Sequence, residues 1–99
     1  QNYPNPFNAG TEIRFQLPKS AYVELTVHNI LGQKVCTLTS GYKPPGHHIL
    51  RWNGINDEGL AVPSGVYFSQ LTIKKVEETD GENSHQTIYN HLRKMIMLK

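Results

Sequence analysis

Apolar and polar residues alternate along much of this chain, and this period of two is the feature that most limits its fold. Over residues 11–17, three apolar side chains fall on one face and polar ones on the other, and Pro18 ends the segment. Residues 22–28 repeat the pattern. Because neighbouring side chains of a strand point to opposite faces, the pattern predicts half-buried β-strands. The chain has no useful apolar stripe with helical spacing.

Turn residues between the alternating segments predict where the chain reverses. Further strands are expected over 34–39, around 48–52, over 66–73 as the most apolar and central one, and from about 86 to 98. Asn53-Gly54 and Asp57–Gly59 are turn sequences, and Asp80-Gly81 predicts a tight hairpin tip. Turn signals at intervals of roughly 8–12 residues favour an all-β fold, an antiparallel β-sandwich of about seven strands.

Strand alternation also predicts the core and one special glycine. The side chains expected between the two sheets are Phe15, Leu25, Val27, Leu50, Trp52, Tyr67 and Leu71. Gly65 follows Pro63-Ser64 and precedes the most apolar strand, where the chain must turn sharply into the sheet. We therefore expect a positive φ at Gly65, which a side chain would oppose.

The composition indicates one domain with an extended entry segment. Residues 1–10 are predicted to be a proline-rich lead-in, because Pro4 and Pro6 fix φ and remove two amide donors, and residues 11–99 form the domain. No apolar run is long enough for a membrane span, and no signal peptide of the usual kind is expected. A net charge of +2 is too small to indicate nucleic-acid binding.

Catalytic and metal sites are not predicted. Cys36 is the single cysteine and is interpreted as a small strand residue, buried or half-buried. The sequence contains no nucleophile-elbow motif, so no enzyme activity and no cofactor are expected. His47 and His48 are adjacent on a strand and point to opposite faces, which disfavours a shared zinc ion.

Two weaker binding sites stay open at this point. Oxygen-bearing side chains gather over 53–58, and calcium prefers such ligands, but their spacing differs from a known calcium loop and the same residues form ordinary turns. A sugar-binding platform would need several exposed aromatic rings, although Trp52 is expected in the core. The aromatic candidates are Tyr22, Tyr42, Trp52, Tyr67 and Tyr89.

Six segments of the chain occur in the order, and nearly the spacing, of two related families. They are 2–8, 11–18, 27–35, 46–54, 63–68 and 93–99. On these segments the chain resembles the type A C-terminal sorting domain of the type IX (Por) secretion system, and it is similar to the immunoglobulin-like domain of the flagellar hook-capping protein. The opening and closing motifs favour the sorting family. The residues that carry the structural motif are Pro4, Pro6, Phe7, Trp52, Gly54, Gly65 and Tyr67.

The resemblance implies an immunoglobulin-like sandwich without chemistry of its own. A sorting domain follows an upstream cargo domain on the same chain and directs it through the outer-membrane translocon. A cysteine-peptidase sortase then usually removes the domain. The cargo would reach the cell surface or the medium by way of the periplasm of a Gram-negative bacterium. The segment that would face the translocon is Arg93, Lys94, Met95, Ile96, Met97, Leu98 and Lys99.

The alternative is a structural or adhesive immunoglobulin-like module. It would resemble the hook-capping relative or an accessory domain of a secreted enzyme, and its information would lie on a lateral surface. The stretch 74–90 is longer than the usual last hairpin of the family, which could alter what a receptor contacts.

Overall fold

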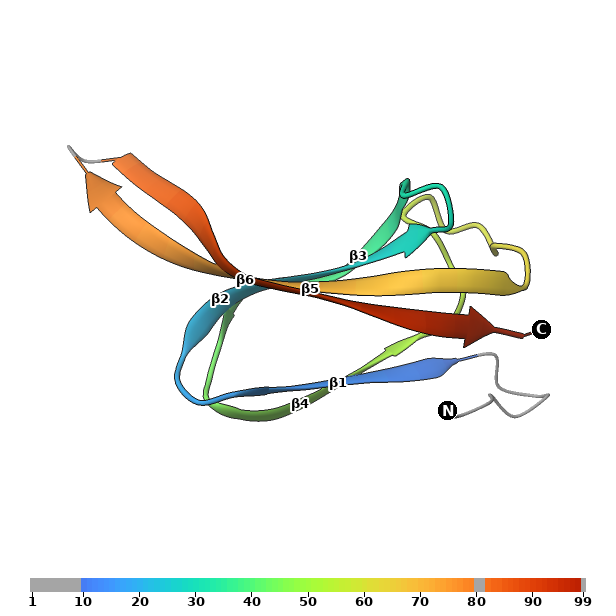
Figure 1. Cartoon of the computed structure of the whole chain (residues 1–99), viewed down its shortest axis with the longest axis horizontal. Coiled ribbons are helices and arrows are strands. Elements are labelled where there is room, and N and C mark those ends of the chain that lie inside the picture. The colour runs from blue at the N-terminus through green and yellow to red at the C-terminus, as the bar shows by residue number, and fades with distance from the viewer. Residues whose placement is uncertain (1–9, 80–81, 99) are drawn as a thin grey trace.

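The computed structural model describes residues 10–79 and 82–98, and it is built from strands that pair antiparallel (Figure 1). The predicted all-β sandwich is confirmed, with six strands in the described residues where about seven were expected. The strands are β1 (Thr11–Leu17), β2 (Ala21–Asn29), β3 (Lys34–Lys43), β4 (Gly46–Trp52), β5 (Gly65–Thr79) and β6 (Glu82–Met97).

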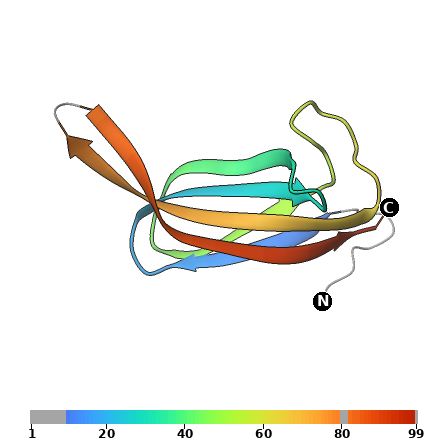
Figure 2. The same ribbon diagram turned by 45° about the horizontal axis from the view of Figure 1, so that its top comes forward.

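The strands form two sheets of unequal width. One sheet holds β1 and β4, and the other has the order β3-β2-β5-β6. Both views show the narrow sheet lying across one face of the wide one (Figures 1 and 2). β5 lies between β2 and β6, in agreement with its prediction as a central strand. The narrow sheet joins strands distant in sequence, since Thr11 pairs with Trp52 and Leu17 with Gly46.

The last two strands are longer than the apolar pattern predicts. β5 and β6 stay paired from Gly65 and Met97 out to Thr79 and Glu82, with one register shift after Ile73. Figure 1 shows this hairpin extending well past the sandwich. Alternation ends near Ile73 because residues beyond the sandwich have no second sheet to face. Backbone hydrogen bonds continue the ladder there, and a hydropathy pattern does not report them.

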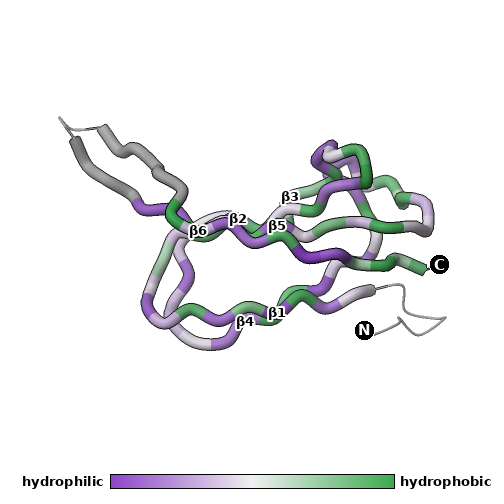
Figure 3. The backbone as a smooth tube through the Cα atoms, in the orientation of Figure 1, coloured by the Kyte–Doolittle hydropathy of each residue, from purple (hydrophilic) through white to green (hydrophobic). Residues whose placement is uncertain are grey.

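The core lies between the sheets and follows the predicted alternation. Leu25, Val27, Trp52 and Tyr67 are buried, and Phe15, Leu50 and Leu71 are partly buried and packed against them, which confirms the predicted set. Green and purple segments alternate along the β1–β4 pair in Figure 3. Further buried apolar residues are Ile13, Leu17, Val23, Cys36, Val62, Met95 and Met97.

Trp52 joins the core to the loop that connects the two sheets. Its indole N–H donates a hydrogen bond to the carbonyl oxygen of Ile55 at 3.0 Å, and its ring meets the Tyr67 ring edge to face at 5.0 Å. The Tyr67 hydroxyl donates to the Pro63 carbonyl oxygen at 2.6 Å. These contacts satisfy the polar atoms of two large buried rings and fix both ends of the loop.

The prediction for Gly65 is wrong. Gly65 is not among the glycines with positive φ, because it is the first residue of β5 and already pairs with Met97. A Cβ atom built there would meet nothing closer than the Tyr67 ring at 4.0 Å, an ordinary contact. The left-handed positions of this connection are Gly54, with φ 78°, and Gly59, with φ 82°. The reversal therefore takes place inside the loop, earlier in the chain than expected.

Candidate functional site

The predicted translocon-facing segment lies mostly within β6, an edge strand of the wide sheet. Arg93 and Lys94 are exposed, Ile96 is half-buried, and Leu98 follows the strand. Lys99 lies outside the described residues, as do the motif residues Pro4, Pro6 and Phe7.

Two members of this segment belong to the core. Met95 is 7% exposed and Met97 is fully buried. Both were expected to offer apolar contact to a receptor, and in the folded domain they are not accessible for it. Their alternation places Met95, Met97 and Arg93 on the inner face of β6, and Lys94 and Ile96 on the outer face.

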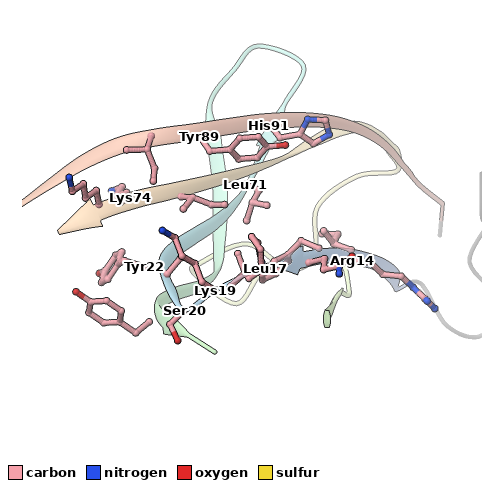
Figure 4. A pocket seen from close by; sticks show the side chains of 18 of the residues that line it. Arg14, Leu17, Lys19, Ser20, Tyr22, Leu71, Lys74, Tyr89 and His91 are labelled. Atoms are coloured by element: carbon pink, nitrogen blue, oxygen red, sulfur yellow. The ribbon is translucent and has the colours of Figure 1, made fainter. Parts of the chain in front are cut away.

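A groove of about 820 Å³ opens between β1 and the middle of the β5–β6 hairpin (Figure 4). Its floor is apolar and comes from Leu17 on β1 and from Leu71 and Ile73 on β5. Tyr22, Tyr42 and Tyr89 also line it, and the Tyr22 and Tyr42 rings meet edge to face at 5.2 Å. A volume of this size lies within the roughly 300–1,000 Å³ of ordinary ligand pockets.

Positively charged side chains surround the groove. The lining includes Arg14, Lys19, Lys74, Lys75 and Arg93, and none of its described residues is acidic. Arg14 forms an ion pair with Glu12 at 2.8 Å, and Lys74 forms one with Glu24 at 3.6 Å. The hydrogen bond and charge of Arg14 hold the pKa of Glu12 below its ordinary value. The groove thus combines an apolar floor with a cationic rim.

A second exposed feature lies at the turn between β2 and β3. The Asn29 side-chain oxygen accepts the amides of Leu31 and Gln33, each at 3.0 Å, and Gly32 takes φ 82°. This tight turn leaves Ile30 72% exposed and Leu31 79% exposed. The sequence signal for this exposed tip is the pair of adjacent apolar residues, Ile30 and Leu31, inside a turn sequence. Strand alternation does not reveal it, because the two residues lie outside the strands.

The residues considered for calcium form a structural turn. The side-chain oxygen of Asn56 accepts the amides of Glu58 at 3.0 Å and Leu60 at 2.9 Å, and an Asp57 carboxylate oxygen accepts the Thr37 amide at 3.1 Å. These oxygens therefore cap backbone amides, which is the ordinary role of Asn and Asp in turns. Among the described residues, no cluster of three or more histidine, cysteine or acidic residues is placed to hold a metal ion.

The histidines and aromatic residues are also separated as alternation predicts. His47 is exposed, whereas the His48 ring stacks on Phe15 at 5.0 Å and its Nε2 donates to the Pro44 carbonyl oxygen at 2.8 Å. Trp52 and Tyr67 are buried in the core. The five aromatic residues considered for sugar binding therefore do not form one exposed platform.

Cys36 is a buried strand residue, as interpreted from the sequence. Burial raises the pKa of its thiol from 9.0 to about 11, and the nearby Asp57 charge adds to the effect. The thiolate is disfavoured in the folded chain, so Cys36 is a poor nucleophile.

Raising the pH should therefore destabilise the fold through Cys36. Its thiol ionises near pH 9 in the unfolded chain and near pH 11 in the folded chain, so the folded state binds more protons between these values. The contribution is complete below pH 9 and is lost as the pH rises to 11, by about 2–3 kcal/mol. Urea unfolding at several pH values would measure this loss of unfolding free energy. The same series on Cys36→Ala gives the pH dependence that comes from the other titrating groups. Equal losses in both chains would contradict the expectation.

One family model matches most of this chain. The model of the FlgD Ig-like domain matches residues 2–78. The solved structure of FlgD from P. aeruginosa is similar, with a TM-score of 0.60 and 20% identity over 89% of this chain and 59% of that chain, and it shows the fold alone. The search of curated proteins found no match. No helix in the described residues could cross a membrane. On the family match, which covers most of its length, the chain belongs to the FlgD Ig-like domain family.

Proposed function

We propose that the chain is a non-catalytic structural module that acts through protein–protein contacts within an exported assembly, as in flagellar hook capping. The family match over residues 2–78 carries this proposal. The geometry supports it, because the exposed features of the described chain include a cationic groove and an apolar turn tip, and its thiol is buried. Surfaces of this kind suit binding to other proteins.

A domain exchange tests the structural role. The Ig-like domain of P. aeruginosa FlgD is replaced by this chain, and swimming and hook assembly are scored in a strain without its own FlgD. We expect the chimera to restore both, whereas FlgD without an Ig-like domain should not. A matched chimera carrying Trp52→Ala is the control. It contains an insert of the same length with a destabilised fold, so it shows whether hook assembly needs a folded module or only an insert. A chimera that is folded and exported but leaves cells without hooks would contradict the hook-capping role.

The second candidate is a sorting signal for the type IX system. The observation that favours it is that Arg93 and Lys94 are exposed on β6, the edge strand that carries the closing motif. An edge strand can present both backbone groups and charged side chains to a receptor. In this case the partners would be the outer-membrane translocon, its cysteine-peptidase sortase and an upstream cargo domain. The final location would be the cell surface or the medium.

Export of a fluorescent cargo tests this second candidate. Residues 1–99 are fused behind a periplasm-exported fluorescent protein in a host with a type IX system. We expect the fusion to reach the surface or the medium, and Arg93→Ala combined with Lys94→Ala to hold it in the periplasm. Lys34→Ala combined with Lys43→Ala removes the same charge from β3 and should leave export unchanged. Normal export of the Arg93 and Lys94 double variant would end the terminal-address hypothesis.

A further inference from the structure

The narrow sheet leaves part of the inner face of β6 exposed. Odd-numbered residues of β6 from Tyr89 to Met97 share its inner face, because side chains alternate along a strand. Met97 is fully buried, but Tyr89 at the other end of the same row is 48% exposed. Two strands, β1 and β4, face a sheet of four. The exposed part of the inner row of β6 runs from Tyr89 to Arg93, and these residues line the groove.

One edge of β1 pairs with no strand among the described residues, and this free edge forms one wall of the groove. Five consecutive residues, from Ile13 to Leu17, line it, although neighbouring side chains of β1 point to opposite faces. No residue of β4 lines the groove, and β4 is the pairing partner of β1 within the described chain. When consecutive residues of a strand line a groove, both faces of the strand border it, so the strand turns its edge towards the groove. That edge carries a row of backbone N–H and C=O groups. Such an edge can pair with an added strand.

The charge around the groove selects among possible strands. Lys19 and Arg93 are two of its five cationic lining residues, and in the described chain neither forms an ion pair. Arg93 belongs to the inner row of β6, and Lys19 lies in the turn after β1. Because the described lining has no acidic residue, a positively charged strand would be repelled there.

We propose that the groove binds an extended acidic segment of another protein, which pairs with the free edge of β1 and completes the sandwich. On the side that faces the wide sheet, its apolar side chains would cover Leu71, Ile73 and Tyr89, and a carboxylate on the same side would meet Arg93. A second carboxylate at its end would meet Lys19. This inference rests on the proposed function and names the surface and the class of partner. The partner segment would add a strand to the fold by β-augmentation, so it needs apolar residues and a carboxylate on the side that faces the wide sheet, and no fold of its own.

Titration with a model peptide tests the proposal. The probe is a blocked peptide of seven residues, matched to the seven residues of β1. It carries valine and a central glutamate on the side that would face the wide sheet, and threonine on the other side. It is added at millimolar concentrations to the 15N-labelled chain of residues 1–99. We expect amide shifts in β1 and in β6 from Tyr89 to Arg93, and slowed hydrogen exchange at the free edge of β1. A peptide with lysine in place of glutamate should bind at least about tenfold more weakly.

Neighbouring charge reversals provide the matched variants. Arg93→Glu should weaken binding of the valine–glutamate peptide about tenfold, whereas Lys94→Glu, on the outer face of the same strand, should change it by less than about twofold. Equal effects of the two variants, equal binding of the lysine peptide, or no shifts in β1 would overturn the proposal. So would self-association of the chain that Arg93→Glu abolishes, because the groove would then hold a second copy. The domain-exchange and export experiments test the proposed function, whereas this titration tests the groove. A failed titration therefore leaves their results unchanged.

Discussion

Replacing Trp52 by alanine is expected to lower the free energy of unfolding by about 3–5 kcal/mol. The indole is buried between the sheets, contacts the Tyr67 ring and donates to the Ile55 carbonyl oxygen. Its removal leaves a cavity and takes away the hydrogen bond that holds the loop after β4. For a domain of this size, such a loss amounts to about half of the usual stability or more.

Urea unfolding of the wild type and of Trp52→Ala would measure the difference, followed by circular dichroism. Trp52→Phe is the matched variant, because it removes the N–H donor and part of the indole but keeps an aromatic ring in the core, so it should lose less. Trp52 is also the single tryptophan of the chain, so its fluorescence reports its own surroundings. An emission maximum typical of water in the folded protein, or an alanine variant within about 1 kcal/mol of wild type, would contradict this placement.

Ending the chain at Leu92 is expected to abolish the cooperative fold. The deletion removes β6 residues that pair with β5 from Gly65 to Ser69, and with them the buried Met95 and Met97. Losing one buried methionine to a cavity already costs about 2–5 kcal/mol, and this deletion removes two together with their backbone ladder. The total is comparable with the whole stability of a small domain.

Thermal unfolding and one-dimensional NMR spectra would check this result. A chain ending at Met97 is the control, since it keeps every paired residue of β6 and should unfold cooperatively near the wild-type midpoint. A cooperative transition in the chain that ends at Leu92 would show that the terminal strand is dispensable. Because the deletion removes core residues, the Arg93 and Lys94 substitutions are the sharper test of sorting.

Strand alternation predicted most of the fold because burial on one face of a strand leaves a direct trace in the sequence. The bounds of β1 and the seven expected core residues agree with the structure. The pattern could not predict the length of the β5–β6 hairpin, since backbone pairing beyond the sandwich requires no apolar face. It also misplaced the reversal before β5 at Gly65, because proline and serine beside a glycine suggested a turn where the strand had already begun.

The candidate site was less predictable, because it depends on how the strands divide between the two sheets. No local pattern reveals that β1 and β4 form a sheet of two against a sheet of four, nor that the inner row of β6 is exposed from Tyr89 to Arg93. The burial of Met95 and Met97 could have been found, since they share the spacing of a core face. Their interpretation as receptor contacts came from the family resemblance of the closing segment, which carries no information on which side faces inward.

The β5–β6 hairpin has a consequence for the order in which the chain folds. Its strands are adjacent in sequence, so the hairpin can close within microseconds once its residues meet, at little loop-closure cost. The β1–β4 pair must instead join Thr11 to Trp52, and β2 must join Asn29 to Tyr67. Such distant pairings are slow, and they follow local ones. We therefore expect the hairpin to act as the template on which β2 docks, with closure of the narrow sheet as the rate-limiting step.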